Sequence, residues 1–186
     1  NLSKYQGFIN AKKFRIIDIS EYKYKNITSI KNFEGAFLVQ NKDKIILDRK
    51  KLKCVTKLKP SKKELKEIEF TFNVCKYVKS NAIVLCNNFS TIGIGAGQPS
   101  RFDSCKIAIQ KAKKFQPQKI KNSIAASDAF FPFTDGVEAL IKAGVKIIIQ
   151  PGGSIRDQEV INCANKGKVK MLFTDIRPVS YKHLRA

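Results

Sequence analysis

Four short segments of the chain carry residues whose types and spacing could do chemistry. In the first, Ser80 and Asn81 stand where a predicted helix ends and a buried strand begins. The amide of Asn81 offers a donor and an acceptor to a reacting group. A residue that only caps the helix could equally be a serine or an asparagine. Residues 79–82 alone therefore do not decide between a cap and a contact with a reacting group.

The second segment, residues 93–101, is rich in glycine. Its spacing is G-x-G-x-G, whereas dinucleotide-binding loops have G-x-G-x-x-G. In addition, Pro99 stands where such a loop would already have entered its helix. We therefore expect the backbone to approach a neighbouring segment or a ligand closely, and we do not assign a dinucleotide site.

The third segment, residues 127–135, places three phenylalanines and a proline between Asp128 and Asp135. Such a stiff apolar wall suits a flat heteroaromatic ring, held by stacking and by hydrogen bonds from its N–H groups to a carboxylate. Alternatively, the phenylalanines belong to the core and Asp135 caps a helix. That alternative explains Asp135 but leaves Asp128 beside an apolar run unexplained.

The fourth segment, residues 150–157, follows an apolar strand and opens a helix. Gly152 and Gly153 free backbone N–H groups, and a helix N-terminus favours an anion or the polar edge of a ring. A generic turn between a strand and a helix would have a similar composition, so this segment does not identify a ligand by itself.

Helix and strand signals give the elements that should position these segments. Ser61 and Glu64 have the spacing of a capping box and start a helix that runs to about Val78. The apolar face of that helix, which we assign to the core, is Leu65, Ile68, Phe72 and Cys75. Upstream, residues 14–19 and 35–40 have strand patterns and are separated by a polar connection.

From Ala82 onward, short apolar strands alternate with helices. The expected strands are residues 82–86, 91–95, 145–150 and 169–173, and the expected helices are residues 100–114, 135–143 and 156–165. The first two strands should pair through a turn at Asn87-Asn88. Asp135 and Glu138 form a second predicted capping box. This alternation predicts an α/β fold with ligands at the carboxyl ends of the strands.

The formal net charge of +21 first suggests nucleic-acid binding. Only six of the basic residues are arginines, however, and the lysines are scattered along the chain. We interpret them as solvated faces, and we keep a non-catalytic basic nucleic-acid-binding module as the alternative function. The chain has no run of eighteen apolar residues, so no membrane span is predicted.

The cysteines and the single histidine limit which kinds of disulfide, catalytic or zinc site the chain could form. The five cysteines are widely spaced and form no C-x-x-C pair, which argues against a disulfide framework and fits a reducing cytoplasm. The single histidine, His183, lies close to the end of the sequence. A zinc deaminase is a third hypothesis, weakened because both the H-x-E and C-x-x-C motifs are missing.

Taken in order, the four segments resemble the AICAR transformylase/IMP cyclohydrolase family of purine synthesis. The matching residues are 79–84, 93–98, 127–133, 150–157 and 173–177. The resemblance implies formyl transfer from 10-formyltetrahydrofolate to the amine of AICAR, in de novo IMP synthesis. It implies a cytidine-deaminase-like three-layer α/β/α sandwich, present here as the C-terminal part of an incomplete transformylase domain.

The resemblance also assigns roles to single residues. Asn81 would contact the reacting groups, Arg177 would hold the nucleotide, and Asp135 would bind the pterin-like ring of the folate. The other residues lining the folate pocket would be Phe102, Pro132, Phe133, Ser154 and Ile155. A structural potassium ion would lie near Val74, Val78, Ser80 and Asp128.

The family's lysine–histidine catalytic pair and its cyclohydrolase domain lie upstream of the matching part, so we expect the chain alone to be inactive. We assign residues 1–60 to a strand-rich connecting segment, 61–177 to the cytidine-deaminase-like subdomain and 178–186 to a foreign or disordered tail. His183, in that tail, is not taken as a catalytic residue. The whole enzyme is expected to be cytoplasmic and homodimeric, without a membrane or nucleic-acid partner.

Overall fold

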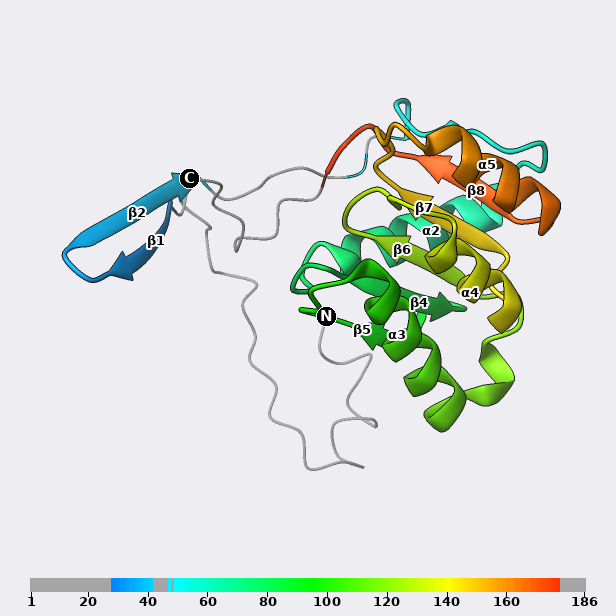
Figure 1. The fold of residues 1–186 in the computed structure, drawn as a ribbon, viewed down its shortest axis with the longest axis horizontal. Helices are drawn as coiled ribbons and strands as arrows, with labels where there is room; N and C mark the ends of the chain where they lie inside the picture. The colour runs from blue at the N-terminus through cyan, green and yellow to red at the C-terminus, as the bar shows by residue number, and fades with distance from the viewer. Residues whose placement is uncertain (1–27, 42–46, 48, 178–186) are drawn as a thin grey trace, which may run out of the picture. The chain divides into compact units, whose positions relative to one another are not determined.

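The computed structural model describes residues 28–41, 47 and 49–177, which fall into two compact units, one within residues 1–42 and one within residues 43–186. The smaller unit holds a β-hairpin (Figure 1), in which β1 (Thr28–Phe33) pairs antiparallel with β2 (Ala36–Asn41). Gly35 in its turn has a φ of +76°, which favours glycine.

The hairpin confirms one prediction and corrects another. The strand predicted over residues 35–40 is β2. The prediction of a polar connection before β2 is wrong for residues 28–33. These residues form β1 by pairing with β2, although their own composition does not indicate a strand. The strand predicted over residues 14–19 lies outside the described residues.

A six-stranded mixed sheet forms the centre of the larger unit (Figure 1). Its spatial order is β3 (Lys53–Cys54), β8 (Lys170–Phe173), β7 (Ile147–Gln150), β6 (Ile124–Ser127), β4 (Ile83–Asn87) and β5 (Ser90–Gly95). Strands β6, β7 and β8 are parallel, whereas β4 runs antiparallel to both of its neighbours. β3 pairs antiparallel with β8, so residues 53–54 of the predicted connecting segment join this sheet.

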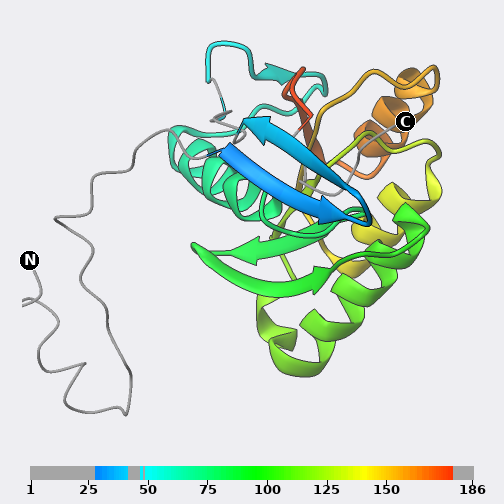
Figure 2. The ribbon, with the colours of Figure 1, turned by 90° about the vertical axis from the view of Figure 1, so that its left-hand side faces the viewer.

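Helices cover both faces of the sheet, which confirms the α/β fold (Figures 1 and 2). One face carries α2 (Lys62–Cys75), and the other carries α3 (Arg101–Phe115), α4 (Asp135–Ala143) and α5 (Asp157–Lys166). Alternate residues of β4 enter two separate cores: Ile83 and Leu85 pack on the side of α3 to α5, and Val84 and Cys86 pack on the side of α2. Pro117–Lys119 forms a short 3-10 helix after α3.

Local hydrogen bonds fix the start of α2. The predicted capping box is confirmed: Glu64 N–H donates to Ser61 Oγ at 3.3 Å, and Ser61 N–H donates to Glu64 Oε2 at 2.6 Å. Ile68, Phe72 and Cys75 are buried as predicted. The helix ends at Cys75 and not at Val78.

The second predicted capping box is wrong. Thr134, not Asp135, precedes the first residue of α4, and its backbone is already helical, with φ −77° and ψ −18°. A side-chain cap needs an extended backbone at that position, so Thr134 makes no such bond. Its hydroxyl instead donates to Glu138 Oε1 at 2.8 Å, and Asp135 Oδ1 accepts the N–H of Gly136 at 2.6 Å.

The turn between β4 and β5 lies one residue further along than predicted. It is formed by Asn88 and Phe89, which have φ of 49° and 55°. Contacts with α2 hold Phe89 in this rare conformation: its N–H donates to Glu67 Oε1 at 3.3 Å, and its ring lies edge-on to Phe70. Within the described residues, no helix combines the length and apolar character that crossing a membrane requires.

Candidate functional site

All four chemistry-bearing segments meet at one edge of the sheet. Because β4 is antiparallel to its neighbours, its first residue, Ile83, lies opposite both Gly95 at the end of β5 and Ser127 at the end of β6. Gln150 at the end of β7 lies opposite Phe173 at the end of β8. The carboxyl ends of four strands and the start of β4 therefore share this edge, as the α/β pattern predicts.

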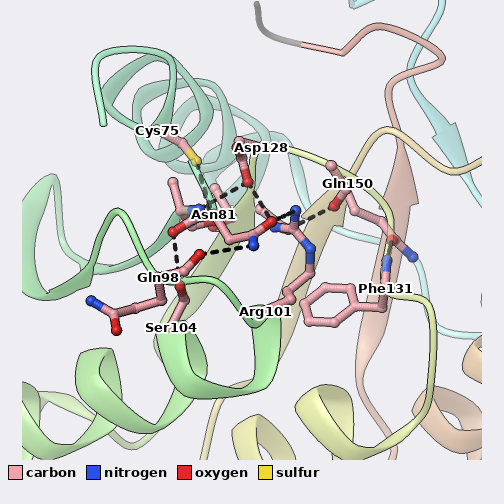
Figure 3. A network of polar contacts seen from close by, with 12 residues as sticks. Cys75, Asn81, Gln98, Arg101, Ser104, Asp128, Phe131 and Gln150 are labelled. Carbon is pink, nitrogen blue, oxygen red and sulfur yellow. Dashed lines mark hydrogen bonds and ion pairs between the residues drawn. The ribbon is translucent and has the colours of Figure 1, made fainter. Parts of the chain in front are cut away.

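A buried ion pair forms the centre of the site (Figure 3). Arg101 Nη1 lies 2.7 Å from Asp128 Oδ1, and the two side chains are only 7% and 2% exposed. The same carboxylate oxygen accepts the N–H of Ala82 at 2.9 Å, while Arg101 Nη1 also donates to Ser127 Oγ at 2.7 Å. These bonds satisfy two charges that would be costly to bury unpaired.

Arg101 also fixes the orientation of Asn81 (Figure 3). Its Nη2 donates to Asn81 Oδ1 at 2.8 Å. The amide nitrogen of Asn81 donates to the carbonyl oxygens of Gln98 and Pro99 at 2.9 and 3.0 Å, and Ser104 Oγ donates to the Asn81 carbonyl at 2.7 Å. The Asn81 side chain is thus held from two directions and does not cap a helix.

Gly93 and Gly95 place α3 so that Arg101 can reach this network. A Cβ on Gly93 would lie 2.1 Å from Ala108 O, and one on Gly95 would lie 1.9 Å from Ser104 O. The close backbone approach predicted for this segment is therefore real, and its partner in the structure is α3. The glycines bring the N-terminal end of α3 against β5.

A cavity of about 460 Å³ opens beside the ion pair. Its lining contains six of the residues singled out from the sequence: Asn81, Phe102, Pro132, Phe133, Asp135 and Arg177. Pro99, Ser100, Arg101, Ala129, Phe130 and Phe131 complete it. Residues from four separate parts of the chain therefore line one cavity, which is partly aromatic and partly charged.

The three phenylalanines of the wall do different things. Phe131 is buried in the core beneath the cavity, whereas Phe130 and Phe133 are 38% and 50% exposed. Arg156, next to the diglycine turn, lies over the Phe133 ring at 4.8 Å. Core packing therefore accounts for Phe131, and the cavity accounts for its two exposed neighbours.

Ser154 and Ile155 do not line the cavity. Ser154 Oγ accepts the N–H of Arg156 at 3.1 Å, and the side chain of Ile155 is fully exposed. The diglycine turn thus reaches the aromatic wall through Arg156. The roles of Ser154 and Ile155 in a folate pocket stay predictions.

Comparison with known proteins now decides the family. The family model described as "AICARFT/IMPCHase bienzyme" matches residues 5–111, more than half of the chain. The chain belongs to the AICARFT/IMPCHase bienzyme family.

Three curated relatives share this family, all called "Bifunctional purine biosynthesis protein PurH". Those of Bartonella henselae and Thermoanaerobacter sp. are both 48% identical, over 79% and 92% of this chain, and that of Aquifex aeolicus is 41% identical over 92%. The chain spans only 28%, 32% and 33% of these relatives.

Likeness to solved structures is much weaker. A Thermotoga maritima diaminohydroxyphosphoribosylaminopyrimidine deaminase/5-amino-6-(5-phosphoribosylamino)uracil reductase matches with a TM-score of 0.37 at 15% identity, over 57% of this chain and 34% of that chain. This likeness is too distant to assign the fold more finely.

Sequence reasoning about this AICARFT/IMPCHase chain missed the role of Arg101. The glycine-rich segment was known to end at Arg101, but no local pattern shows that its partner is Asp128, which lies on another segment. The signal is a carboxylate, Asp128, beside an apolar run, for which the family resemblance offers only a potassium contact. In the structure Asp128 is the counter-ion of Arg101.

Potassium at Val74, Val78, Ser80 and Asp128 stays a prediction for this family member. Asp128 Oδ1 already accepts from Arg101 and Ala82, and the Val74 carbonyl accepts the N–H of Tyr77 at 3.1 Å. These bonds involve Asp128 Oδ1 and not Oδ2, and a carbonyl oxygen that accepts an N–H can still contact an ion through its second lone pair. Among the described residues, no three His, Cys, Asp or Glu side chains gather into a metal site.

Buried thiols are poor candidates for nucleophiles here. Burial raises the pKa of Cys105 to about 12 and that of Cys86 to about 11, and it raises the pKa of Cys75 well above 9.0. All three are therefore protonated at neutral pH, and the thiolate is the reactive form. None of the three lines the cavity, whose polar side chains are those of Asn81, Ser100, Arg101, Asp135 and Arg177.

A larger groove of about 600 Å³ lies between α4 and α5. Side chains of both charges line it, including Glu138, Lys142, Glu159 and Lys166. It lacks the buried ion pair and the aromatic wall that distinguish the smaller cavity, so we assign the candidate site to the latter.

Proposed function

We propose that this chain is the C-terminal part of an AICAR transformylase domain. In the whole protein, that domain would transfer a formyl group from 10-formyltetrahydrofolate to the amine of AICAR, and another domain would supply IMP cyclohydrolase activity. One observation supports the proposal above others: Asn81, Asp135 and Arg177, to which the family resemblance gives three different ligand contacts, line a single cavity.

The reaction makes specific demands on this cavity. The amine of AICAR is a poor nucleophile, because its lone pair is delocalised into the ring and the carboxamide. The enzyme must position the reactants, remove a proton and stabilise developing charge. Asn81 suits a positioning role: Arg101 and two backbone carbonyls hold its amide, both of its N–H groups are used in these bonds, and the second lone pair of Oδ1 is left to accept a hydrogen bond from a reacting group.

Arg177 and Asp135 would bind the two substrates. The guanidinium of Arg177 would hold the nucleotide, for which a planar cation with several donors is well suited. Asp135 would accept N–H groups of the pterin-like ring, against Phe102, Pro132 and Phe133. Ser154 and Ile155 are retained as folate contacts on the family resemblance alone.

The finer description of the whole enzyme belongs to the same proposal. We assign the fold to the cytidine-deaminase-like α/β/α type, supported by the strand order β5-β4-β6-β7-β8, the reversed direction of β4 and the helices on both faces. A homodimer, a cytoplasmic location, the potassium ion and the inactivity of the chain alone rest on the resemblance. The site uses a buried arginine and amides, not the exposed lysines on which the nucleic-acid alternative rested.

The test uses the whole protein that carries this segment. We expect AICAR-dependent release of tetrahydrofolate from 10-formyltetrahydrofolate, and we expect Asn81→Ala to lower kcat by about a hundredfold. Asn162→Ala, which changes an exposed residue of α5 bonded to Gln158, is the matched control and should keep activity. A folded wild-type protein that does not consume the folate in the presence of AICAR would refute the proposal.

A further inference from the structure

Gln150 is a polar residue in a place where the sequence otherwise supplies isoleucine. It ends β7 after Ile147, Ile148 and Ile149, and it is fully buried. A buried amide needs partners for its oxygen and nitrogen. Its oxygen, Oε1, accepts the N–H of Phe131 at 2.8 Å (Figure 3). Its nitrogen lies 3.4 Å from Met171 Sδ.

The bond to Phe131 holds the aromatic wall of the cavity. Among the described residues, it is the hydrogen bond that ties a backbone N–H of residues 129–134 to another element. Pro132 has no N–H to offer. The wall is therefore attached to β7 at one backbone position, between the exposed rings of Phe130 and Phe133, and its first residue is held separately by the bond from Ser127 Oγ to the Ala129 carbonyl at 2.7 Å.

The main chain of Gln150 holds a second side of the cavity. Its carbonyl accepts the N–H of Thr174 at 3.0 Å, and Thr174 Oγ1 donates to Ile176 O at 2.7 Å, next to Arg177. One residue thus attaches both the aromatic wall and the segment that carries Arg177. Only the first attachment uses the side chain, so a substitution can remove one and leave the other.

We propose that Gln150 is a positioning residue for the ring-binding half of the cavity. Its side-chain oxygen sets the place of the Phe130–Phe133 wall, and with it the gap into which a flat ring fits. The identity of that ring as the folate's rests on the proposed function. The attachment itself rests on the contacts of Gln150 alone.

Two variants and one control separate this role from a loss of core packing. Gln150→Met has nearly the same length but lacks the oxygen acceptor, and Gln150→Leu lacks it with a different shape. Met171→Leu changes the other neighbour of the Gln150 amide and leaves the bond to Phe131 in place. All are made in the whole protein, and their unfolding midpoints are measured alongside.

In steady-state kinetics, we expect Gln150→Met and Gln150→Leu to raise KM for 10-formyltetrahydrofolate about tenfold while KM for AICAR stays within about twofold. Met171→Leu should change neither KM. An equal rise in both KM values, or the same change in the control, would overturn the proposal, because a general loosening of the core has no reason to act on one substrate.

Hydrogen exchange gives a readout that does not depend on activity. In the acceptor-less variants, the amide of Phe131 should exchange about tenfold faster, and the amide of Thr174 should not change. Unchanged exchange at Phe131 overturns the proposal even if the enzyme is active. A wild-type protein without formyl transfer would instead refute the proposed function, so the two failures are distinguishable.

Discussion

Arg101 donates to the side-chain oxygen of Asn81 at 2.8 Å while its other terminal nitrogen is paired with a buried carboxylate. The orientation of the Asn81 amide is therefore set by the Arg101 guanidinium, which Asp128 in turn holds in place. A free asparagine side chain could turn over and exchange its oxygen and nitrogen. Here the cation on one side and the two carbonyls on the other allow one orientation.

Removing the charge of Asp128 should affect stability strongly. Asp128→Asn leaves Arg101 buried without a counter-ion, and we expect it to lower the free energy of unfolding by about 3 kcal/mol. The control is Asp103→Asn, whose exposed pair with Lys106 at 3.1 Å should contribute less than about 1 kcal/mol. Urea unfolding followed by circular dichroism measures both. Equal losses of unfolding free energy in the two variants would show that the buried pair stabilises the fold no more than the exposed pair does.

Gly95 should not tolerate a side chain. A Cβ there would meet Ser104 O at 1.9 Å, so Gly95→Ala must push α3 away from β5 and is expected to cost about 3 kcal/mol of stability. Gly153→Ala is the comparison: it meets no atom within 4 Å, and only its φ of +94° is unfavourable, at about 1 kcal/mol. Thermal unfolding of the two variants distinguishes a clash from backbone strain, and the expectation fails if Gly153→Ala is the more damaging.

Glu64 should make stability weakly dependent on acid pH. Burial raises its pKa, but hydrogen bonds from Lys170 and Ser61 outweigh this, so the pKa is lowered below its ordinary value of 4.5. A lowered pKa means that the stabilisation is present above pH 4.5 and is lost as the pH falls through the folded-state value. Because Glu64 is partly exposed, we expect less than about 1 kcal/mol.

The measurement is the difference in unfolding free energy between wild type and Glu64→Gln at pH 7 and pH 3. The difference should be larger at pH 7, where the wild-type carboxylate is charged. A larger difference in unfolding free energy at pH 3 than at pH 7 would contradict a lowered pKa of Glu64. Glu159→Gln, at an exposed position of α5, serves as the control for a general change in surface charge.

Alkylation should distinguish the cysteines by burial. Cys75, Cys86 and Cys105 are buried with raised pKa values, whereas Cys54 and Cys163 are partly accessible, although burial also raises the pKa of Cys163. With iodoacetamide at pH 8, we expect modification of the latter two first and of the buried three only after urea is added. Peptide mass spectrometry reads out the sites. Early modification of Cys105 would show that α3 is not packed as described.

Local signals were enough to predict most elements of the larger unit. The capping box at Ser61 and Glu64 and the apolar run that became β7 each contain their own start or end signal. β6 was not predicted, since its four residues, Ile124–Ser127, include two alanines and are a strand only because β4 and β7 lie on either side. β3, with two residues, is defined entirely by its partner β8.

The sequence named six residues of the cavity lining but none of the bonds within the site. Asn81 and Asp135 stand in segments singled out by composition, Arg177 comes from the family resemblance alone, and all three line one cavity, whereas Ser154 and Ile155 do not. The pairing of Arg101 with Asp128 and the bond from Phe131 to Gln150 join segments that are distant in the sequence. Such contacts depend on how the strands are ordered in the sheet, which no local pattern contains.

The position of β8 has a consequence for how the site comes into being. The cavity needs Asn81, which precedes β4, and Arg177, which follows β8, so it is complete only after the strand furthest along the chain has been added beside β7. A ligand that contacts both Asn81 and Arg177 would then bind only molecules in which β8 is in place, and by mass action it would favour that folded state over unfolded ones.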